Sequence, residues 1–135
     1  MIQKVRSFAK INLFLYVVSR RQDGYHNLYS LMTRIDLADD LTLDFSAEKI
    51  RVSCDHPDVP KDETNIACKA AHAFFNAAKS RVNHGGLFID INKRIPPGGG
   101  LGGGSSNAAA VLTALNAYYG RLFSVSELME MGVTL

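Results

Sequence analysis

Residues 98–104 read GGGLGGG, and Pro96-Pro97 stand directly before them. Ser105, Ser106 and Asn107, three residue types that favour helix N-caps, stand directly after, and an alanine-rich stretch follows. Glycine lets the backbone approach a ligand closely, and a helix N-terminus presents free N–H groups with partial positive charge. The segment therefore predicts a loop that wraps a phosphate.

Other interpretations of this loop fit less well. A flexible linker would stay polar, whereas here rigid prolines precede the glycines and a helix follows them. Gly98, Gly100 and Gly103 satisfy GxGxxG, but the acidic residue expected about 20 positions later is missing, and the nearest is Glu127. The residue directly before Ser105 is not a lysine, which excludes the P-loop of nucleoside triphosphatases.

Two polar side chains interrupt an apolar run near the N-terminus. Lys10 and Asn12 are two residues apart, so they project from the same face of a strand predicted at 11–18. Such a pair is easier to explain at a pocket than in a core, although Lys10 alone also suits a solvated edge strand. Tyr25 and His26 follow in a polar turn, where they are either surface residues or a stacking and hydrogen-bonding pair.

Further polar residues have plain structural explanations. Asn65 or Thr64 is expected to cap a helix. Lys93 and Arg94 flank the glycine loop and either touch phosphate or are solvated. The remaining histidines and the two cysteines show no metal-ligand spacing, so we expect reduced thiols and no protein-held metal site; they are His56, His72, His84, Cys54 and Cys68.

Strands and helices must position these residues. Alternating apolar residues predict strands, with most of them paired with sequence neighbours as hairpins, and helical spacing with caps predicts three helices, which together give an α+β domain. The strands are expected at 11–18, 28–35, 41–45, 50–54 and 86–92. The helices are expected after Asn65 with Ile66, Ala70, Ala73, Phe74 and Ala77 on one face, from Asn107 to a stop at Gly120, and after a Ser124–Glu127 capping box.

Composition sets bounds without choosing a function. The 135 residues suit one domain, 1–135, and 47% hydrophobic with 21% charged residues is typical of a globular protein. A net charge of +2 leaves an anionic small molecule and weak nucleic-acid binding both open. No secretory signal or membrane-spanning run is visible, so we expect a cytoplasmic protein with no membrane partner.

The glycine loop is similar to the second motif of the GHMP small-molecule kinases, which runs approximately P-x-x-x-G-L-x-S-S-A. Pro96, Gly100 and Leu101 match it, whereas glycines occupy the serine places and Ser105-Ser106 come two residues late. AKINLFL at 9–15, DGYH at 23–26 and IPPGGGLGGGSSNAA at 95–109 resemble the members of this family that act on a cytidylated methylerythritol.

That resemblance implies a ribosomal-S5-like domain, with a mixed, largely antiparallel sheet and helices packed on one side. It also implies transfer of the ATP γ-phosphoryl group, with Mg²⁺, to the 2-hydroxyl of the substrate in the non-mevalonate isoprenoid pathway. Lys10 would then lie beside the acceptor hydroxyl as the catalytic residue. Asn12, Tyr25 and His26 would bind the substrate, Tyr25 by stacking on the cytosine. The implied ATP-binding residues are Asn65, Pro96, Pro97, Gly98, Gly99, Gly100, Leu101, Gly102, Gly103, Gly104, Ser105 and Ser106.

The resemblance further places a catalytic aspartate and a second domain beyond Leu135, so we expect these 135 residues to be the front part of a longer enzyme and inactive alone. Two alternatives stay open. One is a non-catalytic RNA-binding module, because the S5-like fold also serves ribosomal proteins, although the charge balance shows no basic face and we expect no nucleic acid. The other is a GHMP kinase for a different alcohol.

Overall fold

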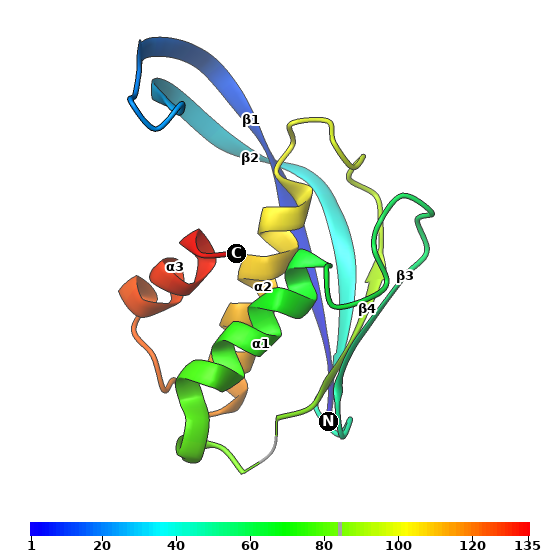
Figure 1. The fold of residues 1–135 in the computed structure, drawn as a ribbon. Coiled ribbons are helices and arrows are strands. Elements are labelled where there is room, and N and C mark those ends of the chain that lie inside the picture. Colours follow the sequence, from blue (N-terminus) through cyan, green and yellow to red (C-terminus); the bar gives the residue numbers. More distant parts are fainter. Residues whose placement is uncertain (84) are drawn as a thin grey trace.

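A mixed four-stranded sheet forms one layer of the protein in the computed structural model, which describes residues 1–83 and 85–135 (Figure 1). His84 lies outside the described residues. The strand order is β1 (Ile2–Arg20), β2 (His26–Asp44), β4 (Leu87–Asn92) and β3 (Ile50–Cys54). β1 with β2 and β2 with β4 are antiparallel, and β3 with β4 is parallel. The predicted α+β class with a mixed, largely antiparallel sheet is confirmed.

The helices form the second layer, on one side of the sheet (Figure 1). They are α1 (Ile66–Ala78), continued by the short 3-10 helix η1 (Lys79–Arg81), then α2 (Gly103–Tyr118) and α3 (Val125–Val133). α1 and α2 pack against each other, and α3 contacts both. In the described part of the chain, no helix is long and apolar enough to cross a membrane.

The core lies between these layers. Alternate side chains of β2 and β4, such as Leu43 and Ile89, face the helices and are fully buried. Phe74 of α1 and Leu115 of α2 meet them from the other side, also without exposure. Each such side chain contributes roughly 1.5–3 kcal/mol by leaving water. This packing fixes the end of β4 and the start of α2, between which the glycine loop runs.

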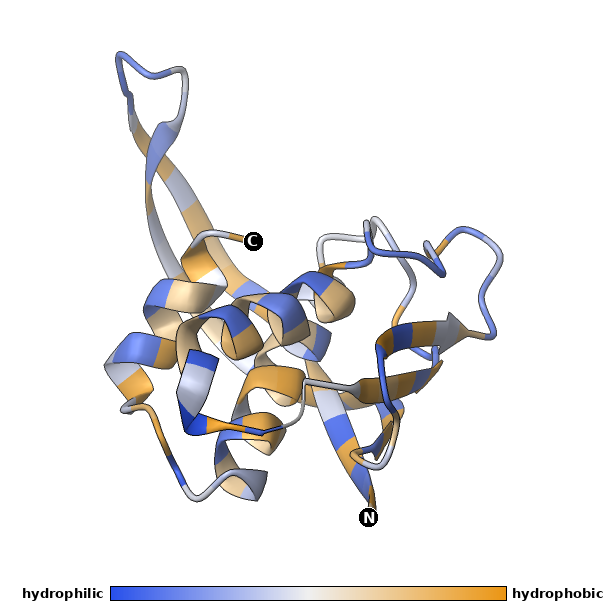
Figure 2. Ribbon diagram, turned by 60° about the horizontal axis from the view of Figure 1, so that its bottom comes forward, coloured by the Kyte–Doolittle hydropathy of each residue, from blue (hydrophilic) through white to orange (hydrophobic). Residues whose placement is uncertain are grey.

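The outer parts of β1 and β2 leave the body of the protein as a two-stranded ribbon. On β2, the residues that pair with β4 are Asp40–Asp44. Within the described part of the chain, residues 11–35, which we call the arm, therefore pair only within the β1–β2 hairpin. The arm projects beyond the helices and curves over at its tip (Figure 1), and apolar residues lie along it (Figure 2). Its exposed apolar side chains are Leu13, Phe14, Leu15, Tyr16, Val17, Val18, Tyr25, Leu28, Tyr29, Leu31 and Met32.

Several predicted strand features are wrong. The strand predicted at 11–18 runs from Ile2 to Arg20, and those at 28–35 and 41–45 are one strand, β2, because Asp39 between them is buried and hydrogen-bonded instead of forming a turn. In the described chain, only β1 and β2 pair as a hairpin of sequence neighbours. β3 and β4 are parallel because α1 carries the chain back across the sheet between them.

Two predicted helix features also need correction. The helix after the glycine loop begins at Gly103 and not at Asn107, so the last two glycines of the loop lie in its first turn. α1 keeps Ala70 and Phe74 buried as predicted, but Ala77 is exposed and Ala67, Ala71 and Ala78 are buried, so its inner face is rotated from the predicted one. The stop at Gly120 and the Ser124–Glu127 capping box are confirmed.

Candidate functional site

The glycine loop borders a hollow of about 470 Å³, which lies between the loop and the start of α1. Residues 96–105 form one wall, and Thr64, Asn65 and Ile66 at the start of α1 form the wall opposite. The remaining lining residues are Asp58, Val59, Pro60, Lys93 and Asn107. Two helix N-termini, those of α1 and α2, therefore open onto one cavity, which is a favourable place for an anionic ligand.

The loop holds a backbone conformation that side chains other than glycine rarely adopt. Gly98, Gly100 and Gly102 have φ angles of 74°, 72° and 70°, in the left-handed region. Gly102 is the N-cap of α2, and no side-chain cap bond satisfies the amides of its first turn within the described chain. Such amides, together with the helix dipole, can bind phosphate oxygens.

The serines that the sequence offered as caps lie inside the first turn of α2. Ser106 donates its amide to the carbonyl of Gly102 at 2.9 Å, which is the first helical hydrogen bond. Ser105 lines the glycine-loop hollow, whereas Ser106 lines a different hollow, beside β1. The two adjacent serines therefore face different cavities.

Lys10 lies against this helix start. Its amide donates to the carbonyl of Leu101 at 2.9 Å, and a Cβ placed on Gly102 would be 3.2 Å from the Cγ of Lys10. The structure thus brings the predicted catalytic lysine beside the loop, where its partly buried stem packs on glycine. Asn12 is exposed at the root of the arm, and its Oδ1 accepts from the hydroxyl of Ser30 at 3.3 Å.

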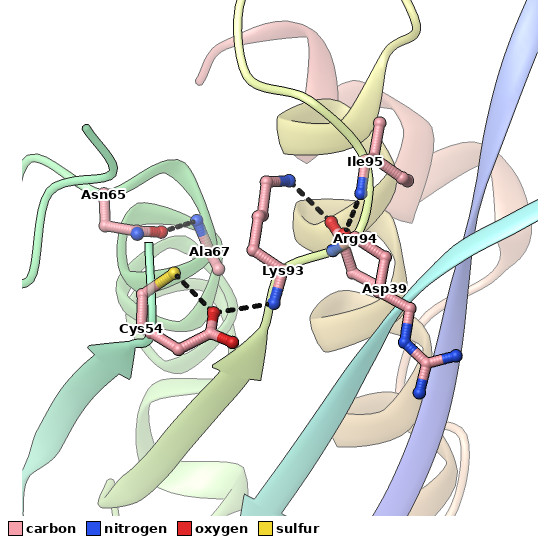
Figure 3. A network of polar contacts seen from close by, with 8 residues as sticks. Asp39, Cys54, Asn65, Ala67, Lys93, Arg94 and Ile95 are labelled. Atoms are coloured by element: carbon pink, nitrogen blue, oxygen red, sulfur yellow. Dashed lines mark hydrogen bonds and ion pairs between the residues drawn. The ribbon is translucent and has the colours of Figure 1, made fainter. Parts of the chain in front are cut away.

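Asn65 is the N-cap of α1, as one interpretation of the sequence predicted. Its Oδ1 accepts from the amide of Ala67 at 2.9 Å (Figure 3). Its Nδ2 donates to the carbonyl of Pro60 at 2.7 Å. Nearby, Asp62 accepts from the amide and hydroxyl of Thr64, which lowers the pKa of Asp62. These bonds fix the wall opposite the glycines.

Tyr25 and His26 are not brought to the loop. They lie at the tip of the arm, where the carbonyl of Tyr25 accepts from the amide of Arg21 at 2.6 Å and its own amide donates to Asp23 at 3.1 Å. Tyr25 is 73% exposed. Ten residues of β1 separate Lys10 from the strand end, roughly 30 Å of extended chain before bulges and curvature shorten it.

Two residues at the site escaped the sequence interpretation. Asp39 is fully buried and binds three donors from residues 93–95, with Lys93 among them (Figure 3). The sequence contained a signal for Asp39, because it lies midway between Leu37 and Leu41 in the alternating pattern of the strand and so occupies an inward position. Asn107 lines the hollow, and its buried Oδ1 has no partner among the described residues. A buried amide oxygen without a partner is a place for a ligand donor.

Both cysteines are free thiols, as predicted, and both are buried. Burial, with the nearby charges of Glu63 and Asp62, raises the pKa of the Cys68 thiol, which makes it a poor nucleophile at neutral pH. Among the described residues, no group of three or more histidine, cysteine, aspartate or glutamate side chains is arranged to hold a metal.

Comparisons with known proteins agree with this geometry. Residues 65–135 match the model of the GHMP kinases N terminal domain. The chain is 48% identical over 128 residues to a Syntrophotalea carbinolica protein and 42% identical over 129 residues to one from Nostoc sp., both named 4-diphosphocytidyl-2-C-methyl-D-erythritol kinase. Each alignment covers 94% of this chain, but only 45% and 41% of those relatives, so the chain spans less than half of their length.

Solved structures of kinases also superpose on this chain. A crystal structure of 4-(cytidine 5'-diphospho)-2C-methyl-D-erythritol kinase superposes with a TM-score of 0.76 at 37% identity, covering 96% of this chain and 46% of that one. The Methanococcus jannaschii mevalonate kinase superposes with a TM-score of 0.69 at 14% identity, covering 98% and 45%, and supports the fold alone. From the matched domain, which includes the glycine loop and α2, it follows that this chain belongs to the GHMP kinases and carries their N-terminal domain.

Proposed function

We propose that residues 1–135 form the nucleotide- and alcohol-binding domain of an ATP-dependent kinase that acts in the cytoplasm on 4-diphosphocytidyl-2-C-methyl-D-erythritol. The product would be phosphorylated on the 2-hydroxyl, a step of non-mevalonate isoprenoid synthesis. One observation carries the proposal: three left-handed glycines lead directly into the uncapped N-terminus of α2 at the wall of a hollow. The names of the relatives support the choice of substrate.

The residues present fit a triphosphate. A Cβ on Gly103 would lie 2.9 Å from both the Cγ2 of Ile95 and the Nζ of Lys93, so only glycine keeps the chain this close. The first-turn amides of α2 would donate to phosphate oxygens, and Asn107 would donate or accept through its amide. A bound ATP supplies the phosphoryl group for transfer. Mg²⁺ would accompany the phosphates, and Ser105 is the hydroxyl that the helix start offers to it.

Lys10 would act on the acceptor alcohol. Its ammonium, held near Gly102, would compensate the negative charge that grows between the attacking oxygen and the phosphoryl group. Phosphoryl transfer asks the protein mainly for positioning and electrostatic stabilisation, which a lysine anchored by its own amide to Leu101 can supply. Asn12 would orient the alcohol from the same strand face.

The arm would hold the cytidine. The exposed ring of Tyr25 offers a stacking platform, and His26 can donate to and accept from the base edge. Because the arm tip and Lys10 lie far apart along β1, the substrate would lie along the arm. The curvature of the arm (Figure 1) would bring the tip closer to Lys10 than an extended strand would.

The test is the acceptor specificity of the whole protein. ADP release should be fast with the cytidylated methylerythritol and slow with methylerythritol itself, mevalonate or homoserine. Equal turnover of an alcohol without cytidine would make the protein a GHMP kinase of another specificity. Absence of ADP release with every alcohol, together with tight RNA binding, would overturn the kinase proposal.

A further inference from the structure

The junction between β4 and the glycine loop is held by a carboxylate from a different strand. Asp39 lies on β2 and is 0% exposed. Its Oδ1 accepts from the amides of Arg94 and Ile95, each at 2.8 Å, and its Oδ2 accepts from the Nζ of Lys93 at 2.5 Å (Figure 3). One side chain therefore fixes three consecutive residues at the entrance of the loop.

The amides of Arg94 and Ile95 bond to Asp39 at a point where the β2–β4 ladder has ended. The ladder between β2 and β4 ends at the pair of Asp40 with Asn92, so the chain beyond Asn92 has lost its partner strand. Pro96 and Pro97, which follow Ile95, have no N–H to continue a ladder. An ionised carboxylate can accept all three bonds, and such charge-assisted bonds are stronger than neutral ones.

The same network reaches the exit of the loop. The Nζ of Lys93 would be 2.9 Å from a Cβ on Gly103, so the ammonium lies against the first turn of α2. Only 4% of the Lys93 side chain is exposed, and the residue lines the hollow. A cation at a helix N-terminus is unfavourable by itself. The charge of Asp39 offsets this cost and keeps Lys93 in place, at the end where an anion would bind.

We propose that Asp39 is a positioning residue for the nucleotide site: through Lys93 and the amides of residues 94–95, it sets the distance between the two ends of the glycine loop. The inference rests on the proposed function, because it requires a nucleotide in the hollow. Asp39 touches no ligand itself. Its role differs from that of a simple structural ion pair, since its partners are the loop that wraps the phosphates and the lysine beneath them.

The test compares Asp39→Asn, Lys93→Met and the double variant in the whole protein, with Asp40→Asn as the matched control. Asp40 is the sequence neighbour of Asp39 and pairs with the side chain of Arg94 at 2.8 Å on the surface, where both side chains are substantially exposed. Binding of a non-hydrolysable ATP analogue, the KM for ATP, the KM for the alcohol and the melting temperature are measured for each.

Asp39→Asn should weaken analogue binding and raise the KM for ATP on the order of 10- to 100-fold, because small misplacements of positioning groups have effects of this size. The KM for the alcohol should not change, and Asp40→Asn should match wild type. The double variant should lose less than the product of the two single effects, since both act through one network.

If Asp39→Asn lowers the melting temperature but leaves analogue binding unchanged, the ion pair of Asp39 with Lys93 has only a structural role, and the inference is overturned. If Asp39→Asn does not fold, Lys93→Met decides, because it keeps the bonds of Asp39 to the backbone. Unchanged analogue binding in Lys93→Met would then overturn the inference. If wild type does not bind the analogue, the proposed function fails, whereas wild-type binding that every variant retains defeats this inference alone.

Discussion

The glycine loop and the tip of the arm differ in how much of the protein holds them. The loop is fixed at its entrance by Asp39, at its middle by the amide of Lys10 and at its exit by the packing of Gly103 on Ile95. Among the described residues, the hydrogen bonds of the tip lie within its own turn, and Tyr25 is 73% exposed. The first site is preorganised, whereas the second offers groups that a ligand or another surface must order. Preorganised sites lose less entropy on binding.

Lys10 stands between the two regions, and its removal should have the largest effect. Lys10→Met keeps the stem that packs on Gly102 but removes the charge, so kcat should fall roughly 10²- to 10³-fold, as when one transition-state donor is lost. ATP affinity and melting temperature should stay near wild type. Lys4→Met, an exposed lysine on the same strand, is the control. A kcat equal to that of the control would remove Lys10 from the chemistry.

Gly103→Ala tests how tightly the loop is held. Its methyl group would meet Ile95 and Lys93 at 2.9 Å, so it should lower stability by roughly 1–3 kcal/mol, as other overpacked sites do, and weaken nucleotide binding. Gly104→Ala is the matched control, because its Cβ would be 3.4 Å from the Cγ2 of Ile66 and alanine favours helices. Urea unfolding of both variants gives the comparison. Equal stability would show that the exit of the loop tolerates movement.

Changes at the arm tip should affect substrate and little else. Tyr25→Ala should cost roughly 1–3 kcal/mol of binding to the cytidylated alcohol through lost stacking. His26→Ala should cost about the same through an unpaired base edge. Melting temperature and ATP affinity should not move, because both residues are exposed and far from the loop. If the variants still prefer the cytidylated alcohol as strongly as wild type does, the tip is not its binding site.

The cap of α3 touches neither region and should give the smallest effect. Ser124→Ala removes a cap worth about 1 kcal/mol, and because α3 has no buried residue, local fraying should absorb part of it. Hydrogen bonds from the backbone and then the side chain of Ser124 lower the pKa of Glu127. The stability that the Glu127 carboxylate contributes to the capping box is therefore present at neutral pH and is lost as the pH falls through that lowered pKa. Hydrogen exchange of the α3 amides in wild type and Ser124→Ala, at neutral and acid pH, measures both. Equal protection at neutral pH would contradict the cap.

The parts of the site that sequence predicted are those with local signals. Glycine and proline spacing indicated the loop, and a lysine two positions before an asparagine indicated the pair at the root of the arm. Asp39 was missed because its partners, residues 93–95, are 54 to 56 positions away, and no local pattern joins them. Two predicted strands proved to be one because β1 pairs with β2 on both sides of the predicted turn, at Arg34 and again at Ala38, Asp39 and Asp40. The start of α2 was misplaced because a left-handed glycine without a capping side chain, and not a serine, occupies its N-cap position.

The distance in sequence between Asp39 and Lys93 also has a kinetic consequence. Contacts between remote residues form late, because closing the intervening chain costs entropy before any contact compensates it. Helices and the β1–β2 hairpin, which are local, should therefore appear before the junction that shapes the loop. On refolding, far-UV circular dichroism should recover ahead of fluorescent-nucleotide binding, and simultaneous recovery would contradict this order. A newly made chain would then acquire its secondary structure some time before it can bind a nucleotide.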